Sequence, residues 1–142
     1  MRTVIFACVH NAGRSQMAAA WFNAFADPAK ARAVSAGTQP GSHVHPEVVT
    51  AMREVGIELS GAKPQLLSDE LLAGATDLVT MGCGEACPAV PRGVRRADWP
   101  LEDPKGKPLE QVRKIRDEVR ARVRSLLAEA ELDRQQTSSA GE

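Results

Sequence analysis

Apolar and polar positions along this chain follow two periods, one typical of buried strands and one typical of amphipathic helices. Short apolar segments predict strands at residues 3–7, 31–36 and 77–81, and a weaker pattern predicts a fourth at 94–99. Apolar residues three and four positions apart, or a capping serine, predict helices at residues 16–26, 46–55, 68–73 and 109–131. Because strands alternate with helices, the pattern predicts a doubly wound α/β fold around a small parallel sheet.

We expect a single domain over residues 1–131, because a chain of 142 residues is long enough for one hydrophobic core. Trp21 and Phe22 lie in the first predicted helix, and we expect them to pack in that core. The Ser- and Gln-rich end, residues 132–142, is predicted to be a flexible tail.

Charge and hydropathy argue against several classes of partner. Lysine plus arginine number 18, as do aspartate plus glutamate, so no net charge favours nucleic acid or a membrane surface. The chain has no run of about 18 apolar residues and no leader-like segment, which favours a cytoplasmic protein. Its three cysteines suit neither a disulfide framework nor a four-ligand zinc site, so we expect catalytic, redox or simply buried thiols. We also expect the protein to be a monomer.

The densest group of chemically useful residues follows the first predicted strand. It comprises Cys8, Val9, His10, Asn11, Ala12, Gly13, Arg14 and Ser15, and a predicted helix comes next. A tight loop between a strand and a helix directs backbone N–H groups and the positive helix terminus at an anion. This potential favours a thiolate at Cys8, and the guanidinium of Arg14 can hold a tetrahedral oxyanion bidentately. The sequence therefore predicts a nucleophile inside an oxyanion-binding loop.

Three neighbours support this prediction. Gly13 permits a close backbone approach, Asn11 tolerates a left-handed backbone that braces the loop, and Ser15 can donate its hydroxyl to the thiolate. The alternative is that Cys8 is only a small buried hydrophobe, as cysteines after strands often are. The order of strand, cysteine, glycine, arginine, serine and helix favours the catalytic interpretation.

The loop resembles that of the low-molecular-weight protein tyrosine phosphatase superfamily, particularly its arsenate reductases, through Cys8, Arg14 and Ser15 followed by Gln-Met-Ala. Later segments resemble the same reductases in the same order, at residues 35–38, 51–56, 83–88, 102–104 and 115–118. The resemblance extends from Met1 to about Ala130. It implies a three-layer sandwich with a four-stranded parallel sheet, and the reduction of arsenate to arsenite in arsenic detoxification.

Three cysteines act in turn in the thioredoxin-coupled reductases that this chain resembles. By that resemblance Cys8 attacks arsenate, Cys83 forms a disulfide with Cys8, and Cys87 then pairs with Cys83 for thioredoxin to reduce. The resemblance implies no tightly bound cofactor. Only three residues separate Cys83 from Cys87, where the family commonly has six, so a low-molecular-weight thiol such as mycothiol is an alternative electron donor.

The general acid is also implied by the resemblance. Asp103 matches the family's Asp-Pro position, and Asp98 is the second candidate. The alternative function is a phosphatase that hydrolyses phosphotyrosine or small phosphoesters through a phosphocysteine. The paired later cysteines and the lack of aromatic residues around Asp103 argue against it. A third alternative is a sensor whose three cysteines bind arsenite or zinc.

Two further observations concern ions. Ala19 stands where some relatives have a glutamate that holds potassium, and Lys63 stands where they often have a threonine ligand. We hypothesise that the ammonium of Lys63 replaces the ion and braces Asn11 and Ser35. Elsewhere, His43 and His45 lie two residues apart with no third ligand nearby, so we interpret them as solvated loop residues and expect no metal site.

Overall fold

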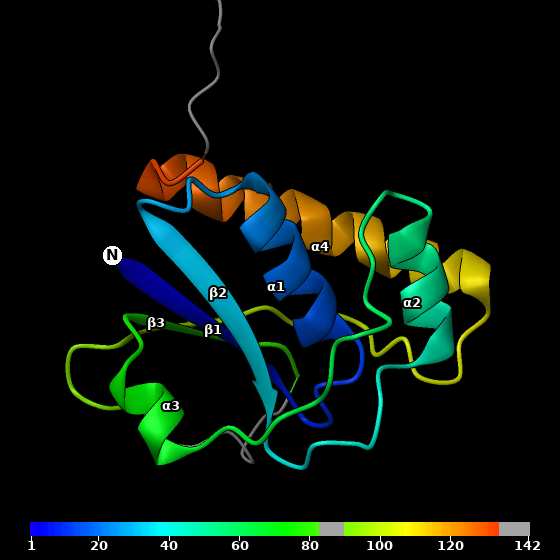
Figure 1. Ribbon diagram of the computed structural model, residues 1–142, viewed down its shortest axis with the longest axis horizontal. Coiled ribbons are helices and arrows are strands. Elements are labelled where there is room, and N and C mark those ends of the chain that lie inside the picture. Colours follow the sequence, from blue (N-terminus) through cyan, green and yellow to red (C-terminus); the bar gives the residue numbers. More distant parts are fainter. Residues whose placement is uncertain (83–89, 134–142) are drawn as a thin grey trace, which may run out of the picture.

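Four parallel strands and four helices make up the fold of the computed structural model, which describes residues 1–82 and 90–133 (Figure 1). The strands are β1 (Arg2–Cys8), β2 (Ala31–Gly37), β3 (Asp77–Thr80) and β4 (Arg95–Asp98), in the spatial order β2-β1-β3-β4. The helices are α1 (Arg14–Phe25), α2 (Pro46–Arg53), α3 (Asp69–Ala73) and α4 (Leu109–Ala130). The predicted α/β fold with a four-stranded parallel sheet is confirmed.

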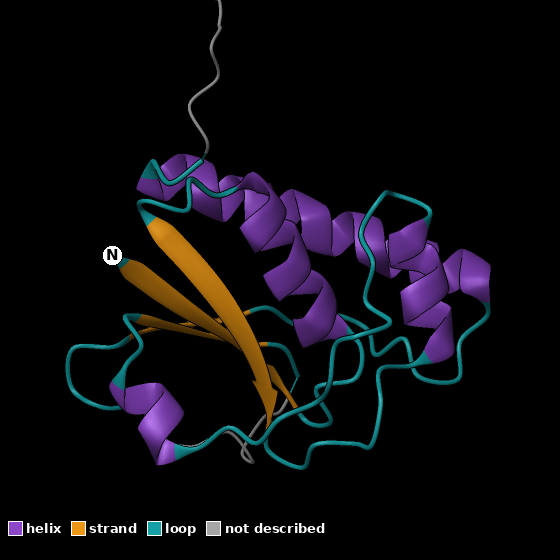
Figure 2. Ribbon diagram, in the orientation of Figure 1, coloured by secondary structure: helices purple, strands orange, loops and turns teal. Residues whose placement is uncertain are grey.

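The sheet separates two layers of helices. Helices α1, α2 and α4 cover one face, and the short helix α3 lies on the other (Figures 1 and 2). Alternate residues of β1 pack into the two cores: Val4 and Phe6 face the larger one, and Ile5 and Ala7 face the smaller one. Because residues 4–8 of β1 are buried on both faces, this part of the strand is a continuous apolar run without a polar alternate position.

The predicted core residues of α1 are buried, with Trp21 5 % and Phe22 0 % exposed. Short helix α3 begins as predicted, because the Ser68 hydroxyl accepts a hydrogen bond from the Leu71 N–H at 3.1 Å. In the described part of the chain, no helix is both long and apolar enough to cross a membrane.

The first two residues after the predicted domain boundary at 131 contact the rest of the domain. Leu132 is only 6 % exposed and accepts a hydrogen bond from the N–H of Asp27, and Asp133 pairs with Ala26 in an isolated antiparallel bridge. Leu132 is an apolar residue at the start of a segment that is mostly polar, so the composition of the segment does not indicate that this side chain is buried. The flexible tail prediction for the remaining residues, 134–142, lies outside the described residues.

Strand register places the functional loops at one edge of the sheet. Cys8 at the end of β1 lies opposite Gly37 of β2, and Ala7 lies opposite Thr80 of β3. Thr80 in turn lies opposite Asp98 of β4. The loops that follow all four strands therefore leave from the same, carboxyl edge, where ligands bind in open parallel sheets.

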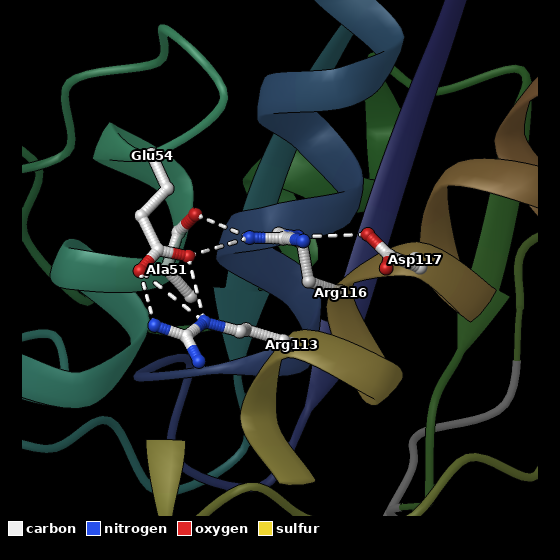
Figure 3. Close-up of polar contacts among 5 residues, drawn as sticks. All are labelled: Ala51, Glu54, Arg113, Arg116 and Asp117. Carbon is white, nitrogen blue, oxygen red and sulfur yellow. Dashed lines mark hydrogen bonds and ion pairs between the residues drawn. The ribbon is translucent and has the colours of Figure 1, made fainter. Parts of the chain in front are cut away.

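A polar network joins the C-terminal end of α2 to α4 (Figure 3). Arg116 is 9 % exposed, and its Nη1 donates to the carbonyl of Ala51 at 2.9 Å and to Glu54 at 3.0 Å. Arg113 also donates to Glu54, at 2.7 Å, and this bond holds the pKa of the Glu54 carboxyl below its ordinary value. The network fixes α2, whose other end contacts the loop that carries Cys8.

Replacing Arg116 by methionine should destabilise the protein by about 1–3 kcal/mol, because the Ala51 carbonyl in the last turn of α2 loses its buried donor. Urea unfolding monitored by circular dichroism measures this loss. The control is Arg53→Met, which removes an exposed ion pair with Glu58 and should leave the urea midpoint nearly unchanged. Equal losses in the two variants would contradict the structural role of Arg116.

Candidate active site

The loop after β1, residues 8–14, has its backbone carbonyls held outward; we call it the anion loop. Six consecutive carbonyls, from Cys8 to Gly13, accept hydrogen bonds at 2.8–3.2 Å. Their donors are the backbone N–H groups of Thr38, Gln39, Gly41, His45 and Met17 and the side chain of Gln16. Across a trans peptide the N–H points opposite to the C=O, so the N–H groups of this loop face its interior. That arrangement suits an anion.

Cys8 lies at the bottom of this loop and is 3 % exposed. Its sulfur lies 2.9 Å from the Ser15 hydroxyl and accepts a hydrogen bond from the Asn11 N–H at 3.3 Å. The side-chain amide of Asn11 donates to the same Ser15 hydroxyl at 2.7 Å. Because the hydroxyl oxygen already accepts from Asn11, its hydrogen is free to point at the sulfur. The Ser15 hydroxyl and the Asn11 N–H therefore converge on the Cys8 sulfur.

Asn11 adopts a left-handed backbone, with φ of 52°, and is braced by two glutamines. Its Oδ1 accepts from the Gln65 N–H at 2.9 Å, and its carbonyl accepts from the Gln16 side chain at 3.0 Å. Gln65 also donates to the carbonyl of Ser35 at 2.8 Å.

These contacts correct the hypothesis that the Lys63 ammonium braces Asn11 and Ser35. The Lys63 residue is exposed, and among the described residues it joins the network only through its carbonyl, which accepts from Gln16 at 3.4 Å. Neutral amide donors satisfy buried oxygens without removing an ammonium from water, which explains why glutamines hold these positions. Gln16, a polar residue directly before the apolar Met-Ala-Ala-Ala segment of α1, was the one sequence signal that could have indicated this.

Arg14 closes the anion loop and is 7 % exposed. Its Nη1 donates to the carbonyl of Leu101 at 2.9 Å, and its Nη2 lies 3.5 Å from the Asp103 carboxylate. The buried Nε has no hydrogen-bond partner among the described residues. A buried N–H donor without a protein partner, next to the Cys8 loop, is available to an oxyanion.

The chain after β3 runs directly against Arg14. Gly82 has φ of +92°, and a side chain there would collide with Nη1 of Arg14. Only glycine allows both this backbone and this approach. The next residue is Cys83, which lies outside the described residues, as does Cys87.

The loop that carries Asp103 covers the anion loop from the other side. A Cβ atom on Gly13 would stand 2.7 Å from the Pro104 ring, so the close approach predicted for Gly13 is made to this loop. Asp103 lines a small pocket together with Cys8, His10, Arg14 and His45. A hollow of about 540 Å³ lies between β4 and α4, but no residue of the anion loop lines it. The volume of a pocket therefore does not identify the candidate active site in this protein.

The structure separates the two candidate acids. Asp103 lies in the Cys8 pocket, with its side chain 48 % exposed. Asp98 lies on β4, where it accepts a hydrogen bond from the Thr80 hydroxyl and lies 3.5 Å from Arg96. The Thr80 hydrogen bond lowers the pKa of Asp98, which keeps that carboxyl ionised. Of the two carboxyls, only that of Asp103 therefore lines the pocket that contains Cys8.

The two histidines differ in their surroundings. His43 is exposed and lies 2.9 Å from the Ser42 hydroxyl, consistent with a solvated loop residue. His45 is half-buried, and its ring lines the Cys8 pocket, so the interpretation of His45 as a merely solvated residue is wrong. The tertiary contact responsible is the hydrogen bond from the His45 N–H to the Ala12 carbonyl. The described residues contain no cluster of three histidine, cysteine, aspartate or glutamate side chains that could hold a metal.

Known proteins are similar to this chain in both sequence and fold. The model of the low molecular weight phosphotyrosine protein phosphatase family matches residues 3–138. A putative arsenate reductase of Halobacterium salinarum is 41% identical over 133 residues, covering 87% of this chain and 89% of the relative. An arsenate reductase of Brevibacillus brevis is 36% identical over 126 residues, covering 87% of this chain and 92% of the relative.

Among solved structures, the thioredoxin-dependent arsenate reductase of Corynebacterium glutamicum superposes with a TM-score of 0.79 at 37% identity. The match covers 92% of this chain, and the chain spans 62% of that protein's length. The sequence matches, the fold match and the loop from Cys8 to Arg14 thus all indicate the same family. The chain belongs to the low molecular weight phosphotyrosine protein phosphatase family and, within it, to the group of the arsenate reductases.

Proposed function

We propose that this protein reduces arsenate to arsenite, with Cys8 as the attacking thiolate. One observation carries the residue assignment: a buried cysteine sulfur lies in a loop whose N–H groups and Arg14 can hold a tetrahedral oxyanion. The relatives from Halobacterium salinarum and Brevibacillus brevis support arsenate as that oxyanion.

The first step forms a bond between sulfur and arsenic. The Cys8 thiolate attacks arsenic, one As–O bond breaks, and the departing oxygen leaves as water once it has received a proton. Asp103, which lies in the same pocket, is the donor we assign. Negative charge that develops on the remaining oxygens is met by the loop N–H groups and by the free Nε of Arg14.

The second step reduces arsenic. The Cys83 thiolate attacks the Cys8 sulfur, the S–As bond breaks, and its electron pair passes to arsenic, which leaves as arsenite. A Cys8–Cys83 disulfide remains. Cys87 then attacks Cys83, which releases the Cys8 thiolate and forms a Cys83–Cys87 disulfide. Two electrons from an external dithiol restore both cysteines.

Two observations support this assignment of the later cysteines. Gly82 lies against the Arg14 guanidinium, and Cys83 follows it directly in the chain. One solved relative is described as thioredoxin-dependent, which supports thioredoxin as the external dithiol. The three-residue gap between Cys83 and Cys87 leaves a low-molecular-weight thiol as the competing reductant.

Arsenate-dependent NADPH oxidation in the presence of thioredoxin and thioredoxin reductase should be supported by the wild type. It should be lost in both Cys83→Ser and Cys87→Ser, because each variant lacks one thiol of the proposed exchange. The rate is followed at 340 nm, the wavelength at which NADPH absorbs, and arsenite is quantified at the end. Ser42→Ala, a change in an exposed loop, serves as the control and should retain the wild-type rate.

Other outcomes discriminate among the alternatives. Turnover only with a low-molecular-weight thiol and a glutaredoxin-like protein would keep the reductase and reject the three-cysteine relay. Phosphate ester hydrolysis without arsenite formation under either condition would reject the reductase in favour of a phosphatase.

Asp103→Asn should lower the rate of the first step about 100-fold, because the amide cannot supply the proton that the leaving oxygen needs. Single-turnover formation of the Cys8–Cys83 disulfide, measured by mass spectrometry after rapid quenching, reports this rate. Asp98→Asn is the matched control and should stay within about twofold of the wild type, because Asp98 does not line the pocket. A large loss in Asp98→Asn alone would exchange the roles of the two residues.

A further inference from the structure

His45 has features of a ligand-binding residue that the loop interpretation did not anticipate. Its ring lines the pocket that also contains Cys8, Arg14 and Asp103. Its Cδ2 lies 3.5 Å from the position that a Cβ atom on Gly13 would occupy, so the ring packs at the rim of the anion loop. The His45 N–H donates to the Ala12 carbonyl at 2.9 Å and ties the residue to the loop.

The imidazole is not used for anything else in the described part of the chain. His45 precedes the first residue of α2, Pro46, but its side chain does not cap that helix. Its ring nitrogens make no hydrogen bond to a described residue. A ring fixed at the rim of an anion pocket with free nitrogens can donate a hydrogen bond to a bound anion.

We propose that His45 contacts the bound oxyanion and takes up a proton from solvent as the anion binds, so that its imidazolium becomes a second cationic donor beside Arg14. This inference rests on the proposed function and names a further residue for the same site. Under this assignment arsenate and phosphate are bound by the loop N–H groups, by Arg14 and by His45 together.

The charges around His45 determine the direction of the effect. Burial lowers the pKa of the His45 ring, so the neutral form prevails near pH 7 in the free protein. Asp103 and Glu47 raise this pKa, whereas Lys105 and His43 lower it by smaller amounts than burial does. A bound dianion adds negative charge and favours the imidazolium. By linkage, protonation of His45 must strengthen anion binding by the same factor.

Isothermal titration of inorganic phosphate tests this in the full chain carrying Cys8→Ser, which removes the thiol from the titration. Repeating the titration in buffers of different ionisation enthalpy gives the number of protons taken up per bound phosphate. The second protein is Cys8→Ser/His45→Gln, since glutamine retains a neutral donor without a titratable ring. The control is Cys8→Ser/His43→Gln, because His43 is exposed and lies outside the pocket.

We expect His45→Gln to weaken phosphate binding about tenfold at pH 6 and by no more than about threefold at pH 8.5, where the ring is neutral in either state. Proton uptake at pH 7 should fall relative to the His45 protein, whereas His43→Gln, which removes only a small influence on the pKa of His45, should change both quantities much less. Protonation of phosphate itself is common to all three proteins and cancels in the comparison. A second substitution, His45→Asn, with circular dichroism spectra of all variants, excludes misfolding as the cause.

Equal affinity ratios at both pH values, or unchanged proton uptake, would overturn the role of His45 while leaving the arsenate reductase intact. Failure of every Cys8→Ser protein to bind phosphate, together with no arsenate turnover by the wild type, would reject the site itself. The two failures are therefore distinguishable.

Discussion

The outward hydrogen bonding of the anion-loop carbonyls is the constraint on which the site depends. An isolated loop does not direct its N–H groups inward by itself, because in a free peptide both the N–H and the C=O groups form hydrogen bonds with water. Here residues 38–45 supply backbone donors to four of the six carbonyls, and α1 supplies the other two through Met17 and Gln16. The anion-binding geometry is therefore built before any anion arrives, which is what electrostatic preorganisation requires.

The same constraint links the site to the rest of the fold. The donors in residues 38–45 follow β2, and β2 pairs along its whole length with β1, which ends at Cys8. His45, the last of these donors, leads into α2. The buried Arg116 holds α2 to α4 through Ala51 and Glu54 (Figure 3). Helix α2 thus contacts α4 at one end, and the residue that precedes its other end donates to the loop carbonyl of Ala12.

Charge in the pocket is balanced among three elements that are distant in sequence. Arg14 provides the fixed positive charge, Asp103 the nearby carboxylate, and His45 a ring whose charge depends on its surroundings. The carboxylate lies close enough to Arg14 to compensate its charge partly. A dianion bound in this pocket would compete with the Asp103 carboxylate for the guanidinium of Arg14.

Sequence alone determined the elements whose signals are local. The buried run of β1, the loop from Cys8 to Ser15 and the amphipathic helices each depend on residues a few positions apart, so periodicity and spacing were sufficient to predict them. The family resemblance added Asp103, which no local pattern distinguishes from other acidic loop residues.

Tertiary structure alone decided which loop side chains meet. The register of four parallel strands brings Asp103 and His45 to Cys8 and leaves Asp98 bonded to Thr80 on β4. The same packing lets Gln16 and Gln65, and not the ammonium of Lys63, donate hydrogen bonds to Asn11 and Ser35. These contacts join residues separated by tens of positions in the chain. Their geometry follows from the crossover connections and the packing of the layers, which no short stretch of sequence encodes.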